Sequence, residues 1–374
     1  MNKKIVLTFV TALCTLSSVA QLNDGFYRIK NVVTKRYVSM QDNKGHVYAQ
    51  QTDVDAAALR TITDYNKILS DPGSVIYLHG VGNNSYDISA QGTSLHQMIN
   101  YYIKLTKQAN GSYYAWQENS GMRLYLSDID DGEPEAYVYA RDKTTRAWSF
   151  LPVSVRSENY LGIKPTVTAK GKYYASFYCG FAFSPTSEGL HVYYVTKIDA
   201  ARGLAVYKEI DAIVPKNAPV FVECTSQNIA DNRVDLTTAA GSLLSPSNLL
   251  RGVYFNINDS FFTGHVNRTA YDSKTMRVLG VCADGSLGYV TSSTLDYLPA
   301  NTSYMVVPES APKELKLVTE QEYIATGISS INIESSDSQS VYDLRGVKVL
   351  EAGEDNAMLP SGVYIRGGKK FLQR

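Results

Sequence analysis

The feature that most constrains the fold is an alternation of apolar and polar residues with a period of two, which recurs along nearly the whole chain. Clear instances are the aromatic-rich runs at 26–30, 102–105, 123–126 and 137–139. Successive side chains of a strand point to opposite faces, so this period is typical of half-buried β-strands. Turn-forming residues separate the runs at short intervals. The sequence therefore predicts an all-β protein.

One segment departs from this period. Between 54 and 69 apolar residues recur at spacings of three and four, and the run Ser-Asp-Pro-Gly at 70–73 then ends the pattern. Such spacing places the apolar side chains on one face of a helix. We therefore expect a single amphipathic helix there, packed on the N-terminal domain.

The first 20 residues predict export. Lys3 and Lys4 precede an apolar run at 5–16, and small residues lead to Ala20 and Gln21. This is the arrangement of a secretory signal peptide, with cleavage expected between Ala20 and Gln21. The apolar run is shorter than the ~20 residues that a membrane-spanning helix needs, and no later segment approaches that length. We expect an extracellular or outer-surface protein without a transmembrane span.

Charge and cysteine content exclude several classes of protein. The 36 basic residues balance 36 acidic ones, so the sequence lacks the positive charge expected of a nucleic-acid binder. Three cysteines follow the predicted signal peptide, Cys179, Cys224 and Cys282, in no Cys-x-x-Cys pair. Neither a zinc site nor a disulfide scaffold is predicted. We expect buried thiols, and an oxidising compartment leaves one disulfide open as an alternative.

The residues that carry chemistry form no catalytic motif. The five histidines are scattered, and the chain contains no Gly-x-Ser-x-Gly elbow. The densest acidic group comprises Asp128, Asp130, Asp131, Glu133 and Glu135. It differs from a calcium loop because its glycine comes one position early and the bidentate glutamate is missing. We interpret it as a solvated turn and predict neither a metal nor a cofactor.

Residues 21–153 contain three weakly similar units, which open at 27–30, 76–79 and 102–105. The run GFYRIKN at 25–31 and the run AWSFLP at 147–152 resemble the first and last strands of a ricin-type β-trefoil. The resemblance covers about a third of the chain and implies a trefoil-like recognition domain. The chain departs from that family at Arg146, where a glutamine is usual, and in the two other lobes, which lack the closing tryptophan.

A sugar offers an apolar face and a set of hydroxyl groups, so its recognition needs an exposed aromatic plane beside planar polar side chains. The third unit contains these ingredients in Tyr113, Trp116, Asn119, Tyr125 and Asp128. We predict Trp116 as the stacking platform and Asn119 or Asp128 as the partner of a hydroxyl group. In the competing interpretation Trp116 fills the core, as Trp148 and Phe150 are expected to do.

A second region, 154–320, contains an internal repeat. The runs LAVY at 204–207 and VPKNAPVFV at 214–222 match the runs LGYV at 287–290 and LPANTSYMV at 298–306. Both copies place a turn with proline and asparagine before a β-branched run. We predict two related β-units, 154–240 and 241–320, or the two halves of one β-sandwich.

The C-terminal tail carries the most specific signal. After an expected linker at 321–340, the runs VYDLRGVKV at 341–349 and LPSGVYIR at 359–366 precede a basic end. Residues 341–374 look like a type IX secretion C-terminal sorting domain, which is a small β-sandwich. The resemblance implies passage through the outer membrane, with the secretion machinery as a partner.

Together these patterns predict a secreted or surface-attached binding protein that is not an enzyme. A glycan or a surface protein is its expected partner. Two alternatives stay open. One is a structural or adhesive surface protein, and the other is a glycan-active enzyme with a carboxylate pair, since any two of the 36 acidic residues could meet in the fold.

Overall fold

The computed structural model describes residues 21–42, 58–62, 65–91, 93–94, 102–119, 121–128, 135–140, 145–241, 243–255, 269–328, 340–351, 359–366 and 369–373. The predicted signal peptide up to Ala20 lies outside these residues. Among these described residues, strands make up 50% and helices 6%. The prediction of an all-β protein is therefore confirmed.

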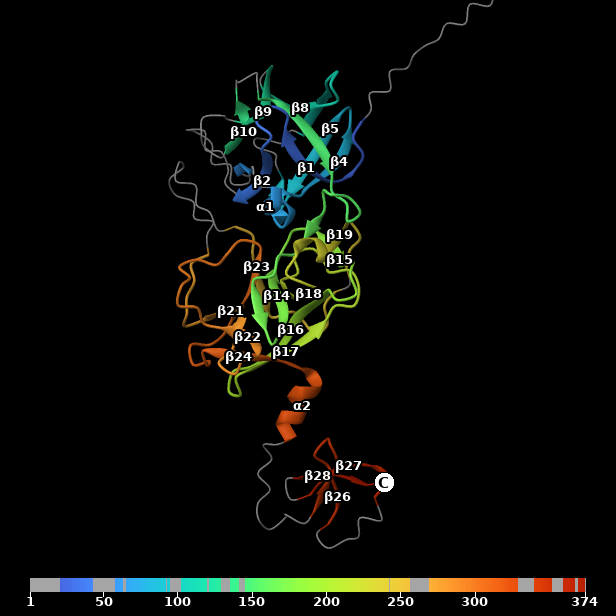
Figure 1. Cartoon of the computed structure of the whole chain (residues 1–374), viewed down its shortest axis with the longest axis vertical. Coiled ribbons are helices and arrows are strands. Elements are labelled where there is room, and N and C mark those ends of the chain that lie inside the picture. Colours follow the sequence, from blue (N-terminus) through green and yellow to red (C-terminus); the bar gives the residue numbers. More distant parts are fainter. Residues whose placement is uncertain are drawn as a thin grey trace, which may run out of the picture.

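Six antiparallel strands of the N-terminal part pair into a closed cylinder (Figure 1). In their order around the cylinder they are β1 (Gly25–Asn31), β4 (Ile76–Gly82), β5 (Ser85–Ala90), β7 (Ile103–Lys107), β8 (Tyr113–Asn119) and β11 (Ala147–Pro152). Each pairs with the next, and β11 pairs back to β1. Closure leaves these strands without an open edge.

The other strands of this part form a second path from β1 to β8. It runs through β2 (Tyr37–Asp42), β3 (Ala58–Ile62), β10 (Glu135–Ala140) and β9 (Met122–Asp128). A short strand, β6 (Thr93–Ser94), pairs with β5.

The prediction of one helix across 54–69 was wrong in its middle. Residues Ala58–Ile62 form strand β3, and only Tyr65–Leu69 form a helix, α1, followed by a 3-10 turn at Pro72–Ser74. Strand β3 pairs with β2 on one side and with β10 on the other. Ladder hydrogen bonds on two sides satisfy the backbone, and this tertiary pairing overrides the local helical period.

The cylinder is filled by large side chains from its own strands. Trp148 is fully buried, and its Nε1 donates a hydrogen bond to the carbonyl oxygen of Leu126 at 2.8 Å. Phe150, two residues on, belongs to the same core cluster. The expectation that Trp148 and Phe150 occupy the core is confirmed.

The central part is dominated by one ten-stranded sheet. Its strands, in spatial order, are β13 (Val167–Ala169), β14 (Lys172–Phe177), β18 (Val220–Cys224), β16 (His191–Asp199), β17 (Leu204–Glu209), β24 (Glu314–Thr319), β22 (Leu287–Val290), β21 (Met276–Val281), β23 (Thr302–Val306) and β20 (Leu250–Val253). A three-stranded sheet of β12 (Leu161–Gly162), β19 (Arg233–Thr237) and β15 (Ala182–Pro185) lies nearer the N-terminal part (Figure 1).

The two halves of the large sheet share one topology. The first half has the spatial order β14-β18-β16-β17, and the second has β20-β23-β21-β22. If the four strands of each half are numbered along the chain, both halves have the spatial order first, fourth, second, third. The matched turns also agree, because Asn217 (φ 62°) and Asn301 (φ 56°) both adopt the left-handed conformation that asparagine tolerates. The repeat seen in the sequence thus has a counterpart in the strand order.

A reciprocal pair of tyrosines joins the halves. Asn301 donates from Nδ2 to the carbonyl oxygen of Tyr178 at 3.0 Å, and the hydroxyl of Tyr254 donates to Oδ1 of Asn217. The centroids of the two tyrosine rings are 4.3 Å apart. Each turn asparagine therefore holds a tyrosine that follows the first strand of the other half.

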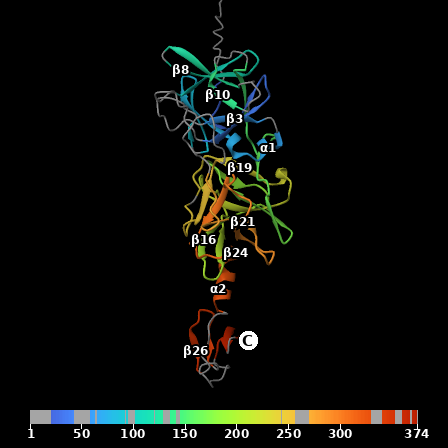
Figure 2. The same cartoon turned by 90° about the vertical axis from the view of Figure 1, so that its left-hand side faces the viewer.

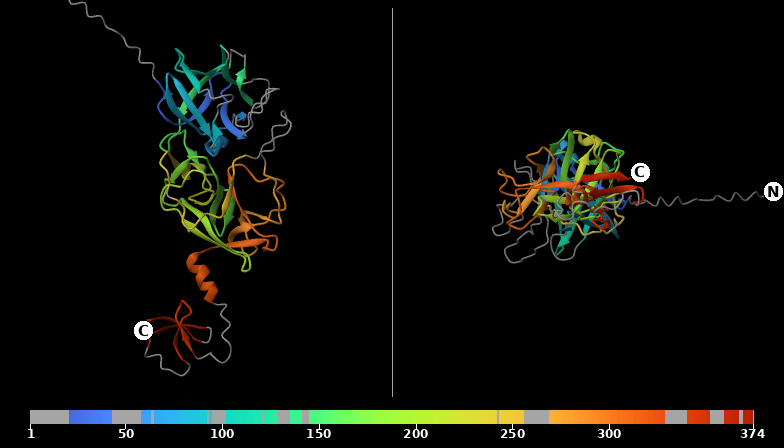
Figure 3. Two further views of the ribbon diagram at one scale, coloured as in Figure 1. Left: turned by 180° about the vertical axis from the view of Figure 1, so that it is seen from behind. Right: turned by 90° about the horizontal axis from the view of Figure 1, so that it is seen from below.

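The N-terminal and central parts are packed end to end (Figures 2 and 3). Arg28 is fully buried at their junction. It donates to Ser74 Oγ at 2.9 Å and to the Ile68 carbonyl at 2.9 Å within the N-terminal part. It also donates to Asn159 Oδ1 at 2.7 Å and to the Tyr160 carbonyl at 2.8 Å in the central part. One side chain therefore ties both parts together.

Helix α2 (Glu320–Ile328) follows the last strand of the central part and lies in the segment expected to be a linker. Tyr323 attaches it to the β16–β17 hairpin, because its hydroxyl donates to Asp199 Oδ2 at 2.9 Å. Lys197 Nζ and Arg202 Cζ lie 4.2 Å and 4.5 Å from the centroid of the Tyr323 ring. None of the helices within the described residues has the length and apolar character required to cross a bilayer.

A separate four-stranded sheet ends the chain. Its spatial order is β26 (Lys348–Leu350), β25 (Val341–Tyr342), β27 (Gly362–Arg366) and β28 (Lys369–Gln373). All its pairings are antiparallel, and its small core comprises Val341, Leu350, Leu359 and Tyr364.

Candidate functional site

The outer surface of strands β7, β8 and β9 carries a layer of aromatic and basic side chains. Tyr113 and Ala115 of β8 belong to the core of the cylinder. Because side chains alternate along a strand, Tyr114 and Trp116 lie on the opposite, outer surface. In the strand register Trp116 stands between Lys104 of β7 and Tyr125 of β9, so the three side chains are immediate neighbours.

Trp116 is covered by two cations. Its Nε1 donates to Thr106 Oγ1 at 2.9 Å, which fixes the orientation of the indole. Lys104 Nζ lies 5.0 Å from the ring centroid, and Arg123 Cζ lies 4.3 Å from it. Both distances are in the range of cation–π contacts. Only 8% of the Trp116 surface stays exposed, although the residue is not part of the core cluster.

Arg146 stacks on two tyrosines beside this tryptophan. Its Cζ lies 4.4 Å from the centroid of the Tyr114 ring and 4.7 Å from that of Tyr125. The two tyrosine rings meet edge to face with centroids 5.9 Å apart. Arg146 Nε is buried and has no hydrogen-bond partner. The guanidinium group is therefore positioned by ring contacts and not by hydrogen bonds.

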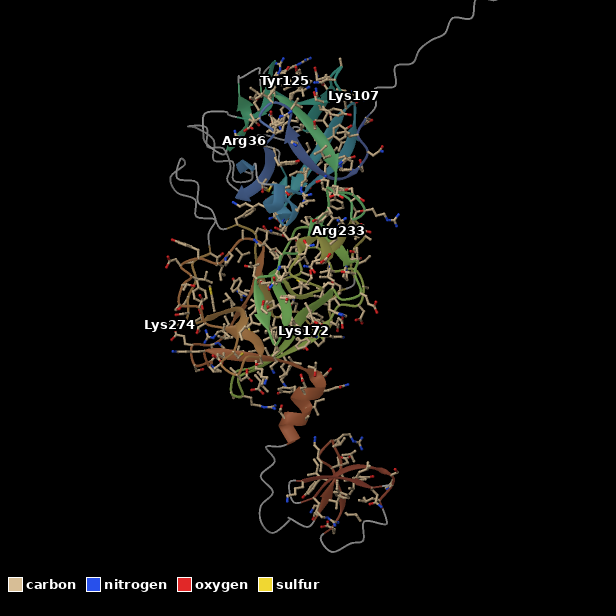
Figure 4. All side chains as sticks on the ribbon, in the orientation of Figure 1. Arg36, Lys107, Tyr125, Lys172, Arg233 and Lys274 are labelled. Carbon is tan, nitrogen blue, oxygen red and sulfur yellow. The ribbon has the colours of Figure 1, made fainter. Side chains whose placement is uncertain are left out.

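We call this surface the stacked face and define it as Lys104, Tyr114, Trp116, Arg123, Tyr125 and Arg146. It carries three cations, and the neighbouring acid Glu118 lies 3.4 Å from Lys104 Nζ. Tyr125 lies at the end of the N-terminal part that points away from the central part (Figure 4). The stacked face is therefore remote from the junction between the two parts.

The structure separates the residues that the sequence grouped as a sugar site. It brings Trp116 and Tyr125 together on the stacked face, whereas Tyr113 packs in the core, edge to face with Phe150 at 5.6 Å. Asn119 ends strand β8, and its side chain lies outside the described residues. Asp128 is fully buried.

Asp128 is engaged in a buried ion pair. Arg36 holds both carboxylate oxygens, with Nε at 2.8 Å from Oδ2 and Nη2 on Oδ1, and Thr34 donates its hydroxyl to Oδ2. These contacts connect the β1–β2 turn to the end of β9. The side chain therefore cross-links two strands of the N-terminal part.

Sequence reasoning missed Lys104, Arg123 and Arg146 as site residues. Lys104 and Arg123 sit on strands that flank Trp116, and strand alternation places them on its side of the sheet. That signal was available in the sequence once the pairing of the strands was assumed. Arg146 was visible only as the residue that replaces a usual glutamine.

Thiol and metal chemistry find little support in the described parts of the chain. Cys179, Cys224 and Cys282 are buried free thiols. Burial raises the pKa of the Cys179 thiol and of the Cys224 thiol to about 12, which suppresses the reactive thiolate. Within the described ranges, no three His, Cys, Asp or Glu side chains are grouped as a metal site would require.

A second group of charged residues lies on the central sheet near Lys172 (Figure 4). His191 Nδ1 is 2.6 Å from Glu209 Oε1, and His191 stands directly opposite Glu223 in the strand register. Lys172 Nζ is 2.6 Å from Glu223 Oε1, and the hydroxyl of Tyr174 donates to Oε2 of the same glutamate. Each carboxylate therefore has a basic partner, as in a surface ion-pair network.

A scan against models of known protein families finds no match to this chain, and a search of curated proteins finds no significantly similar sequence.

Proposed function

We propose that this chain is an exported binding protein without catalytic activity, which recognises glycans through the stacked face. The observation that carries the proposal is the half-exposed pair Tyr114 and Tyr125, whose rings are held in place by Arg146. Aromatic planes fixed in advance lose little entropy when the apolar face of a sugar stacks on them. Neighbouring N–H donors can then bind the hydroxyl groups.

The remaining parts fit the same proposal. A closed cylinder of six strands with a layer of additional hairpin strands supports a β-trefoil-like fold for the N-terminal part. The repeated strand order supports a central β-sandwich built from two related units. The C-terminal four-stranded sheet is compatible with the small β-sandwich of a type IX sorting domain. If the chain is exported, the secreted protein should begin at Gln21. Its intact mass tests this expectation.

A glycan array with the mature protein tests the binding proposal. We expect signal on a subset of glycans and its loss in Tyr125→Ala, because that change removes one stacking plane. Tyr297→Ala is the matched control, since Tyr297 is a 37% exposed tyrosine of the central part. It should bind as the wild type does, and near-UV circular dichroism should show both variants folded.

Three results would decide against the proposal. An empty array would remove glycan binding. Capture of a surface protein together with an empty array would favour the adhesive alternative. Hydrolysis of a polysaccharide that is abolished by Glu209→Gln or Glu223→Gln would favour an enzyme, and those two residues then belong to its carboxylate pair.

A further inference from the structure

We infer that the stacked face binds an acidic glycan, and that Arg123 and Arg146 hold its carboxylate or sulfate groups. The inference rests on the proposed function and specifies its ligand. Both guanidinium groups lie over aromatic rings, Arg123 over Trp116 and Arg146 over Tyr114 and Tyr125. Neither forms a hydrogen bond or an ion pair within the described residues.

Stacking on a ring fixes a guanidinium group without using its N–H donors. A ring contact occupies no hydrogen-bond acceptor, so the N–H donors in the plane of the group stay available to other partners. Arginine stays charged at any physiological pH. Arg123 and Arg146 therefore present oriented, unpaired donor edges, and the planar fork matches two oxygens of a carboxylate or sulfate.

Two other arginines of the N-terminal part have oxygen acceptors for their N–H groups. Arg28 has four hydrogen bonds to neighbouring oxygens. Arg36 holds both oxygens of a carboxylate. Arg146, in contrast, has a buried Nε with no acceptor in the part of the chain that the structure describes. Its Nη groups are not among the buried atoms without a partner, so they are the donors that an anionic ligand can reach.

The local charge agrees with this assignment. The whole chain has a formal net charge of zero, yet the stacked face gathers Lys104, Arg123 and Arg146, and the acid Glu118 lies 3.4 Å from Lys104 Nζ. Trp116 and Tyr125 are directly opposite in the strand register, so the arginines stacked on them lie over adjacent rings. Two neighbouring forks suit a polymer with repeated acidic groups. The half-exposed rings of Tyr114 and Tyr125 beside them leave aromatic surface for its sugar rings.

Binding measurements on the mature full chain test the inference. The probes are polygalacturonate oligosaccharides for carboxylate, dextran sulfate for sulfate, and unmodified dextran and methyl-esterified polygalacturonate as neutral counterparts. Isothermal titration calorimetry should detect binding to at least one acidic probe and none to its neutral counterpart. Affinity should fall as the salt concentration rises, because charged contacts are screened.

Four variants separate the roles of charge and geometry. Arg123→Gln and Arg146→Gln should each weaken binding about tenfold, the loss expected when one charge-assisted fork is removed. Arg146→Lys should also weaken binding, because lysine keeps the charge and lacks the planar fork. Arg251→Gln, at an exposed arginine of the central part, should leave affinity unchanged. Thermal melting of each variant verifies folding.

The outcomes distinguish this inference from the proposed function. If neutral glycans bind and lose affinity in Tyr125→Ala while both arginine variants bind as the wild type does, the acidic ligand is refuted and glycan binding stands. If no glycan binds, both fail. Equal affinity for a single-stranded oligonucleotide of matched charge would also refute the inference, because the face would then attract any polyanion.

Discussion

At the scale of single residues, arginine makes many of the polar links between distant segments. Arg277, only 2% exposed, donates to the carbonyl oxygens of Pro312 at 2.9 Å, Ala311 at 3.1 Å and Ser273 at 2.9 Å. Arg28 does the same at the junction of the N-terminal and central parts. Five N–H donors in a rigid plane let one side chain satisfy several carbonyls that no strand ladder reaches.

Replacing Arg28 by methionine should strongly destabilise the protein. The change leaves buried oxygens of Ser74, Asn159 and two backbone carbonyls without their donor. It also removes a cation near Asp71. Burial raises the pKa of the Asp71 carboxyl group, and the positive charge of Arg28 opposes that rise. We expect a loss of about 3 kcal/mol in the free energy of unfolding. Urea unfolding followed by tryptophan fluorescence measures it.

Arg251→Met is the control for this measurement. Arg251 is exposed, so its replacement should change stability by less than about 0.5 kcal/mol. Equal midpoints for Arg28→Met and the wild type would contradict the role assigned to Arg28.

At the scale of elements, two turns and one helix show how local signals work. The asparagines of the repeated turns adopt φ values of 62° and 56°, where most residues are strained. Helix α2 begins with a capping box, because Glu322 N donates to Thr319 Oγ1 at 3.2 Å and Thr319 N donates to Glu322 Oε2 at 2.8 Å. Thr319 and Glu322 are three residues apart in the sequence, so this helix start was detectable there and was missed.

Two substitutions of Asn301 should separate backbone strain from hydrogen bonding. Asn301→Ala introduces a residue that disfavours the left-handed conformation and removes the bond to the Tyr178 carbonyl. We expect a loss of about 2 kcal/mol, as the two effects together suggest. Asn301→Gly tolerates the conformation and lacks only the bond, so it should lose about half as much. Thermal unfolding compares them, and a larger loss in the glycine variant would contradict this assignment.

At the scale of the whole molecule, the N-terminal and central parts share their cores. Phe255 of the central part belongs to the N-terminal core cluster, and Val75 of the N-terminal part belongs to a central one. The ring of Phe26 bridges the junction, with centroids 5.1 Å from Tyr77 and 5.8 Å from Phe181. Shared apolar burial couples the unfolding of the two parts.

This coupling predicts one unfolding transition in the wild type and two in Phe26→Ala. Both tryptophans lie in the N-terminal part, whereas the buried thiols Cys179 and Cys224 lie in the central part. Fluorescence and pulsed thiol labelling therefore report on different parts. Their urea midpoints should coincide in the wild type. Loss of the Phe26 ring should cost about 2 kcal/mol and separate them.

Tyr173→Ala provides the comparison, because Tyr173 packs against the same central cluster from within the central part. That variant should lower both midpoints together. Midpoints that already differ in the wild type, or that stay together in Phe26→Ala, would show that the junction does not couple the two parts.

The candidate site was only partly predictable. Trp116 and Tyr125 were proposed because an aromatic plane beside planar polar side chains is what a sugar site needs, and the structure places the two residues opposite each other. Tyr113 differs from Trp116 by three positions, an odd number, so alternation alone places them on opposite surfaces, but it does not say which surface faces the core. The cations were missed because cation–π contacts join strands whose register no local pattern states.

What the sequence determined by itself was local. The period of two predicted strands, the residues of the repeat predicted a matching turn with proline and asparagine in each copy, and the position of Trp148 predicted its burial. Only the tertiary structure decided that Ala58–Ile62 is a strand, that Arg28 is fully buried, and that Arg146 lies on two tyrosines. The reason is physical: local periodicity sets which side chains share a surface, whereas the partners of that surface depend on strand pairings between residues far apart in the chain.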